Sequence, residues 1–227
     1  MFSVPLRSTQ SICATLANKF TSTNMKSILI AIALLVSGLA YGQTAEEYLS
    51  RGNSKIELED YRGAIADYNK IIELIPNESI AYYNRGIAKE ALEDYRGAIA
   101  DYNKALELNP YNANIYHGRG NVKFKLEDYR GAIADYNKII DLYPNHTMAS
   151  IAYHSRGVIK EALEDYKGAI AEFTKAIELR PNYADPYFGR GLDKLKLGQK
   201  DEGCMDLSKA GELGYSKAYD YIKQHCN

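Results

Sequence analysis

Apolar side chains recur along this chain at the spacing of amphipathic helices. Ala64, Tyr68 and Ile71 stand four and then three positions apart, and the same spacing returns downstream. Before each such stretch a Tyr precedes a Gly by four positions, as Tyr82 precedes Gly86, so that the two share a helical face. The pattern therefore predicts pairs of helices that each bury one apolar stripe.

A repeated segment sets the length of the helix pair. The eleven residues DYRGAIADYNK occur at 60–70, 94–104 and 128–138, and a related copy, DYKGAIAEFTK, occupies 165–175. An Arg-Gly pair marks the register at Arg51, Arg85, Arg119, Arg156 and Arg190. The successive spacings are 34, 34, 37 and 34 residues, and 34 residues is the length of a helix–turn–helix repeat. The sequence thus predicts one repeat array.

Residues that are common at the ends of helices mark where the predicted helices begin and end. Leu-Glu-Asp-Tyr stands between the two halves of a unit at 58–61, 92–95, 126–129 and 163–166, and its Asp is expected to cap the second helix. The second halves end at Pro76, Pro110, Pro144 and Pro181, because Pro cannot continue a helix. We expect five units at 45–78, 79–112, 113–149, 150–183 and 184–214, followed by a capping helix at 215–227. Three additional residues within 145–149 lengthen the connection or start the following helix earlier.

The residues at these positions resemble the tetratricopeptide repeat family. The match is carried by small, aromatic and turn residues at Tyr48, Gly52, Ala64, Tyr68, Ile71 and Pro76, and at the same offsets in the next three units. The resemblance extends over about residues 45–213. The resemblance implies an all-α fold, a right-handed α-solenoid of helix-turn-helix repeats with a C-terminal capping helix.

The chain departs from the family's pattern at the recurring Arg, because the family usually has Leu there. An acidic residue precedes the aromatic residue of the second helices, at Asp67, Asp101, Asp135 and Glu172. We predict that each Arg reaches a carboxylate on a neighbouring helix. The alternative is a solvated Arg whose aliphatic stem covers apolar surface.

The fifth unit is degenerate, as expected of a terminal repeat. Lys200, Gly203 and Leu207 replace the Tyr, the Ala and the aromatic residue of the other units, and Gly214 stops the helix. Residues 216–225 are expected to form one more helix, whose Tyr219 and Ile222 would cover the end of the stack. This ending also looks like the tail of short exported bacterial tetratricopeptide proteins.

The resemblance also implies where a ligand lies, because in this family the first helix of each unit lines the concave face. The register carries this face over to Leu49, Asn53, Ile80, Tyr83, Asn84, Ile87, Asn114, His117, Asn121, Phe124, Ile151, His154, Val158, Phe188 and Leu192. An apolar groove with Asn and His side chains suits an extended peptide or a partner helix. The competing interpretation is that some of these residues only pack between adjacent repeats.

One ligand of the family is disfavoured by charge. Asn53 and Asn84 match two Asn positions of the clamp that holds a chaperone's terminal carboxylate, but its cationic positions hold Leu49, Asn114 and Gly118. Without those cations the clamp lacks its charge-assisted hydrogen bonds.

Composition argues against nucleic-acid binding. The 227-residue chain carries 28 Lys and Arg residues against 29 Asp and Glu residues, a formal net charge of −1. Because residues 1–42 hold three bases and no acid, the remaining body is mildly acidic, which opposes binding to a phosphate backbone. Most of the 20 Tyr residues fall at fixed repeat positions, so we expect them to pack rather than to stack on bases.

A basic start and a short apolar core characterise the segment that begins at Met25. Lys26 is followed by an apolar run at 28–41, shorter than the roughly 20 residues of a spanning helix, and by small residues before Gln43. We expect residues 25–42 to be a cleaved signal peptide that exports the protein to the periplasm or beyond, without a stable membrane span. An uncleaved membrane anchor is the alternative. Residues 1–24 are best explained by a mis-assigned start, and an organelle transit peptide competes with that explanation.

Two pairs of side chains are candidates for further chemistry. Cys204 and Cys226 form a candidate disulfide if the compartment is oxidising, and two buried free thiols are the alternative. His117 and His154 occupy the same position in consecutive repeats, but no third ligand with suitable spacing accompanies them. We therefore expect no metal and no cofactor.

The sequence holds no catalytic constellation that we recognise. It shows no paired carboxylates in an apolar context, no Ser/His/Asp order and no phosphate-cradling Gly loop. We therefore predict a non-catalytic interaction scaffold, not an enzyme, that binds a protein or peptide partner. A structural protein that self-associates into a homo-oligomer is the alternative.

Overall fold

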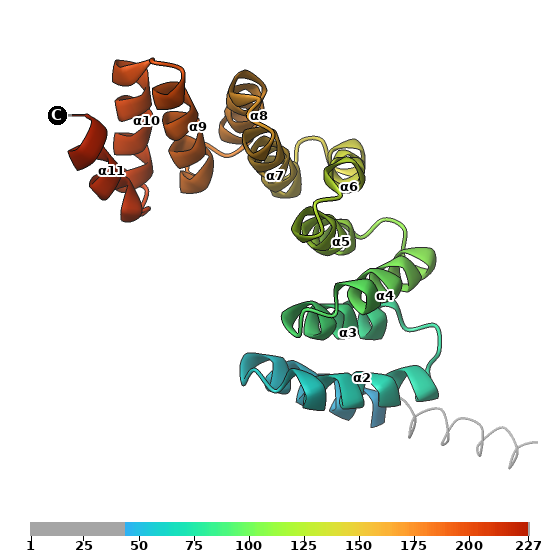
Figure 1. Ribbon diagram of the computed structural model, residues 1–227. Coiled ribbons are helices and arrows are strands. Elements are labelled where there is room, and N and C mark those ends of the chain that lie inside the picture. Colours follow the sequence, from blue (N-terminus) through green and yellow to red (C-terminus); the bar gives the residue numbers. More distant parts are fainter. Residues whose placement is uncertain (1–43, 227) are drawn as a thin grey trace, which may run out of the picture.

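Helices joined by short turns make up the whole of the part that the structure, a computed structural model, describes, residues 44–226 (Figure 1). A helix at residues 44–57 is followed by α2 (Tyr61–Leu74), α3 (Ser79–Ala91), α4 (Tyr95–Leu108), α5 (Ala113–Lys125), α6 (Tyr129–Leu142), α7 (Thr147–Ala162), α8 (Tyr166–Leu179), α9 (Ala184–Lys196), α10 (Lys200–Glu212) and α11 (Lys217–His225). These residues include no strand. The predicted signal segment lies outside the described residues.

Consecutive helices pack in antiparallel pairs, which we number as repeats. Repeat 1 is the helix at 44–57 with α2, and repeats 2 to 5 are α3–α4, α5–α6, α7–α8 and α9–α10. Each pair also contacts the next, and the stack curves into an arc with α5 and α7 on its inner side and α6 and α8 on its outer side (Figure 1). The predicted all-α, right-handed solenoid is confirmed.

The predicted caps are present at the second helix of the first four repeats. Asp94 Oδ1 accepts a hydrogen bond of 3.0 Å from the backbone N–H of Gly97 in the first turn of α4. Asp60, Asp128 and Asp165 make the same bond before α2, α6 and α8. These bonds satisfy backbone donors that have no partner within the helix.

One large side chain fills the space between the two helices of each repeat. Tyr102 is fully buried, and a Cβ atom placed on Gly86 would lie only 2.7 Å from its ring. Because Gly has no side chain, α3 can lie directly on this ring. Tyr68, Tyr136 and Phe173 fill the same place in repeats 1, 3 and 4.

The recurring Arg joins the two helices of its repeat and, from repeat 2 onward, also contacts the preceding repeat. Arg85 donates to both carboxylate oxygens of Asp101, at 2.9 Å from Nε and 2.6 Å from Nη2, and its Nη1 donates to Asn69 Oδ1 in the preceding repeat at 2.6 Å. Equivalent ion pairs join Arg51 to Asp67, Arg119 to Asp135, Arg156 to Glu172 and Arg190 to Asp206. The prediction that each Arg reaches a carboxylate on a neighbouring helix is confirmed.

The three additional residues of the 37-residue spacing start a helix earlier. The first helices of repeats 2, 3 and 5 have 13 residues each, whereas α7 has 16 and begins at Thr147. His146 precedes it and accepts a hydrogen bond of 3.2 Å from the N–H of Met148. The sequence left a longer connection and an earlier helix start open, and the structure has the second.

The array ends with α11 packed on α10. Leu207 replaces the aromatic residue of the other repeats and is fully buried, as is Ala218 on α11. Tyr219 lies over Gly211 but remains 56% exposed, so the predicted covering stripe is only partly formed by Tyr219. The buried position belongs to its neighbour Ala218.

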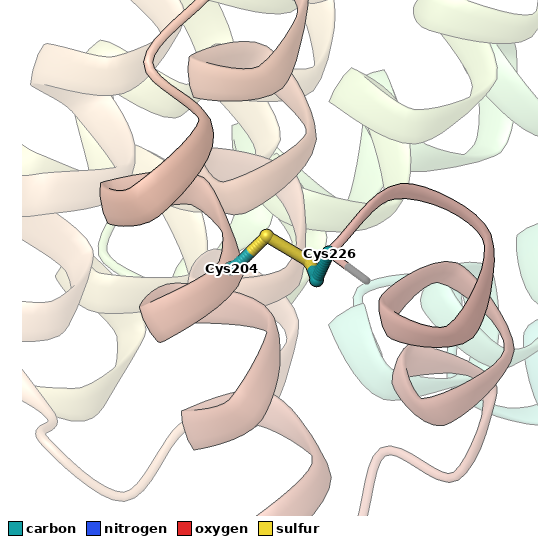
Figure 2. Close-up of a disulfide and its surroundings, with 2 residues drawn as sticks. All are labelled: Cys204 and Cys226. Carbon is teal, nitrogen blue, oxygen red and sulfur yellow. A yellow bond between two sulfur atoms is a disulfide. The ribbon is translucent and has the colours of Figure 1, made fainter.

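A disulfide joins the last two helices. Cys226, directly after α11, is bonded to Cys204 on α10, and their Cα atoms lie 5.7 Å apart (Figure 2). The bond closes a segment of 22 residues in sequence separation. It therefore fastens the capping helix to repeat 5 at the far end of α11.

Candidate functional site

The predicted groove residues lie on the first helices of the five repeats. Leu49 and Asn53 lie on the helix at 44–57, and the others on α3, α5, α7 and α9. Asn53, Ile80 and Asn114 are exposed, the other twelve are partly exposed, and none of the fifteen is buried. The inner face thus presents a row of accessible apolar, aromatic and amide side chains.

A hollow of about 390 Å³ opens on this face between repeats 1 and 2. Ile56, Ile80 and Ile87 supply its apolar walls, and Asn53 and Asn84 lie among them. Asn53 Oδ1 accepts hydrogen bonds from Tyr68 Oη at 2.9 Å and from Asn84 Nδ2 at 3.1 Å. The two amides are therefore held in place by the protein itself, next to apolar surface.

Aromatic rings recur at one register position of the inner face. Tyr83, His117 and His154 stand there in repeats 2, 3 and 4, and each packs on the buried ring of its own repeat, at centroid distances of 5.9, 6.2 and 5.6 Å. Phe188 is the equivalent residue of repeat 5. Its ring stacks on Tyr215 at 4.4 Å and meets Tyr221 of α11 edge-on at 5.3 Å. The predicted groove residue Phe188 is therefore also in contact with the C-terminal capping segment.

The two groove histidines are held in their neutral form. Burial lowers the pKa of His117, against a smaller opposite effect of Glu90. Burial also lowers the pKa of His154, and the Nδ1 of His154 lies 3.4 Å from Tyr183 Oη. Both histidine side chains are therefore polar but uncharged at neutral pH. Across the described residues, no group of three or more His, Cys, Asp or Glu side chains is placed to hold a metal ion.

Two ion pairs that the sequence did not reveal connect first helices of consecutive repeats. Lys125 Nζ lies 2.9 Å from Glu90 Oε1, and Lys196 Nζ lies 2.8 Å from Glu161 Oε1. Each pair spans 35 residues. No motif marks such pairs, because they depend on how one repeat is placed against the next.

Asp193 is the second feature that sequence reasoning missed. Its side chain is fully buried and one carboxylate oxygen, Oδ2, has no hydrogen-bond partner. The pKa of Asp193 is raised to about 6, mainly by burial and also by the nearby Glu161, while Lys196 opposes both effects. A signal was available in the sequence, because the equivalent positions of repeats 2 to 4 hold Ala88, Val122 and Ile159.

Family models identify the chain. Models described as tetratricopeptide repeat match residues 45–78, 79–112 and 111–182. Together they span residues 45–182, which is more than half of the 227-residue chain. The chain belongs to the tetratricopeptide repeat family. No curated protein matches it.

Solved structures of other proteins share the fold. A crystal structure of MamA protein is 25% identical, covers 78% of this chain and 96% of its own, and has a TM-score of 0.64. YrrB, a TPR protein with an unusual peptide-binding site, is 23% identical, with coverages of 81% and 98% and a TM-score of 0.60. PilF of Pseudomonas aeruginosa is 16% identical, with coverages of 77% and 78% and a TM-score of 0.68.

The helices of the described part are short or amphipathic. None of those within residues 44–226 is long and apolar enough to cross a membrane.

Proposed function

We propose that this protein is a non-catalytic scaffold that binds a segment of a partner protein along the inner face of its repeat array. The row of accessible apolar, aromatic and amide side chains on successive first helices carries the proposal. Apolar pockets supply contact area, and fixed amides such as Asn53 can bond the backbone of an extended peptide or the polar side of a helix. The peptide-binding site of YrrB, which has the same fold, supports this function.

A peptide selection with the whole chain as bait tests the proposal. The best selected peptide is synthesised and titrated calorimetrically against the wild type and against Tyr83→Ala with Ile87→Ala on α3. We expect these substitutions to weaken binding at least about tenfold, because a few anchor side chains carry most of the binding free energy.

The matched control lies on the outer helices. Arg96 and Arg130 have exposed side chains in the first turns of α4 and α6, so Arg96→Ala with Arg130→Ala should leave the affinity unchanged. A peptide that loses affinity with the control pair but not with the α3 pair would place binding on the outer face and contradict the proposal. Circular dichroism of all variants checks that they fold.

Self-association is the second candidate, and the C-terminal end favours it. Met205 is 72% exposed on α10 beside an open hollow of about 710 Å³ that Tyr187, Lys209 and Glu212 also line. An exposed apolar side chain in a concave surface is a feature of contact sites. Light scattering that shows a mass above that of one chain, falling on dilution and with Met205→Lys, would establish this role.

Export to an oxidising compartment is also part of the proposal. Two observations support it, the signal-like residues 25–42 and the Cys204–Cys226 disulfide, because such bonds persist outside reducing compartments. Intact-mass analysis of the mature protein tests it. We expect a new terminus at Gln43, and a terminus upstream of Met25 would contradict it.

A further inference from the structure

Another hollow, which shares Leu192 with the predicted groove, lies where repeats 4 and 5 meet the capping helix. Its volume is about 520 Å³, and its walls are formed by Glu161 of α7, Leu192, Leu195 and Lys196 of α9, and Tyr221 and His225 of α11. Two leucine side chains and an aromatic ring thus surround a polar side formed by Glu161, Lys196 and His225. We call it the repeat 4–5 cavity.

The charges beside this cavity do not balance. Lys196 Nζ lies 2.8 Å from Glu161 Oε1 and 3.4 Å from Asp193 Oδ1, so two carboxylates share one ammonium group. Asp193 is fully buried three residues before Lys196 on α9, and its Oδ2 has no hydrogen-bond partner. When both acids are ionised, this cluster retains one negative charge that no cation among its contacts neutralises.

The same ion pair exists elsewhere in the array without the second acid. Between repeats 2 and 3, Lys125 pairs with Glu90, and the residue equivalent to Asp193 is the buried Val122. The bridge between repeats therefore does not need a carboxylate at this position. A buried acid at an apolar position costs stability, and this acid contacts Lys196, which lines the cavity.

We propose that the repeat 4–5 cavity receives a cationic side chain, the ammonium of a Lys or the guanidinium of an Arg, from the partner segment. The inference rests on the proposed function and names the chemistry of one partner residue. The incoming cation pairs with Glu161, and Lys196 turns to Asp193, so that two cations face two carboxylates. The aliphatic stem of the ligand lies on Leu192 and Leu195, within reach of the Tyr221 ring for a cation–π contact.

Two small probes test this site without a partner. Nα-acetyl-lysine N-methylamide presents the cation, and Nα-acetyl-norleucine N-methylamide presents the same stem without the charge. Both are titrated into the isotope-labelled whole chain at neutral pH while amide NMR signals are followed. We expect saturable shifts at Leu192 and Leu195 with the lysine probe and none with the norleucine probe.

Substitutions distinguish binding of the lysine probe in this cavity from a non-specific attraction of a cation to an acidic protein. Asp193→Val, which copies Val122, should weaken binding of the lysine probe at least about tenfold, because the second carboxylate no longer draws Lys196 away from Glu161. Asp193→Asn should do the same, while the matched change Glu90→Gln between repeats 2 and 3 should have no effect. Equal shifts with both probes, or unchanged binding to the two Asp193 variants, would overturn the inference.

Failure of this inference can be distinguished from failure of the proposed function. If a selected peptide binds the groove and keeps its affinity when its Lys and Arg residues are replaced by norleucine, this inference fails and the proposed function stands. If no peptide binds but the lysine probe saturates the cavity, the proposed function fails alone.

Discussion

Four glutamates of this chain adopt a backbone conformation that favours glycine. Glu59, Glu93, Glu127 and Glu164 each have φ of 60° at the turn between the two helices of a repeat. At Glu93, backbone hydrogen bonds run from Glu93 N–H to Glu90 C=O and from Asp94 N–H to Lys89 C=O, which is the Schellman pattern of a helix end. Repeat 5 places Gly198 at this position, with φ of 78°.

Replacing one of these glutamates should therefore stabilise the protein. We expect Glu93→Gly to raise the free energy of unfolding by about 0.5–1 kcal/mol, because glycine has no Cβ to clash in the left-handed region. Urea unfolding measures the change. Gly198→Ala is the reciprocal control and should lower stability by a similar amount, and a loss of stability in Glu93→Gly would contradict this explanation of the turn.

Asp193 should make stability fall as pH rises. Its pKa of about 6 in the folded state lies above that of an unfolded Asp, because burial disfavours the charged carboxylate. The stabilisation of the protonated form is complete below pH 4 and is lost as pH rises through about 6. We expect Asp193→Val to raise the free energy of unfolding at pH 7 by about 1–3 kcal/mol and to have a smaller effect at pH 4.

Unfolding experiments at the two pH values measure this difference. Val122→Ile is a suitable control, because it changes volume at the equivalent buried position of repeat 3 without adding a titrating group. An Asp193→Val variant with the same gain at both pH values would show that packing, not charge, sets the effect.

At the scale of elements, the disulfide holds the last helix. α11 has nine residues, which is too few for a stable isolated helix, and it contacts the array through the buried Ala218, through Tyr219 over Gly211 and through Tyr221 on Phe188. The bond between Cys204 and Cys226 limits how far this helix can move when it detaches (Figure 2). The cap of the array is therefore held by a covalent link in addition to its own packing.

Replacing both cysteines by serine should loosen this end. For a loop of this length we expect a loss of about 3 kcal/mol by the chain-entropy model, and faster hydrogen exchange at Ala218 and Tyr221. Proteolytic mapping without reductant should recover the two cysteines in one cross-linked fragment. Recovery of two free thiols from the untreated protein would contradict the bond.

At the scale of the whole molecule, the sequence predicted the contacts within each repeat. It missed the contacts that depend on how one repeat is placed against the next. The repeated segment predicted the helix pairs and the Asp caps. The acidic residue before the aromatic residue of each second helix predicted the ion pair with the recurring Arg. The contact from Arg85 to Asn69 and the pair between Lys196 and Glu161 cross from one repeat to another. Such contacts need the rotation between repeats, which no local pattern specifies.

Arg119 occupies the middle of the array and links its two halves. It pairs with Asp135 in its own repeat and donates to Asn103 in the preceding repeat at 2.6 Å. In a linear array, stability is approximately the sum of repeat terms and nearest-neighbour interface terms. Removing Arg119 weakens both the stability of repeat 3 and its interface with repeat 2. The two ends of the array should therefore begin to unfold independently.

We expect Arg119→Gln to lower the free energy of unfolding by about 2 kcal/mol, less than for a fully abandoned buried carboxylate, because Lys123 still pairs with Asp135 at 2.8 Å. Hydrogen exchange should then show α3–α4 and α8–α9 opening with different free energies. Arg51→Gln is the matched control. The side chain of Arg51 is 56% exposed and its pair with Asp67 lies within repeat 1, so Arg51→Gln should cost less stability than Arg119→Gln and should leave the relative opening of α3–α4 and α8–α9 unchanged. If Arg119→Gln instead lowers protection from exchange equally in all helices, the array unfolds as one cooperative unit. The contacts of Arg119 then do not determine which parts of the array unfold together.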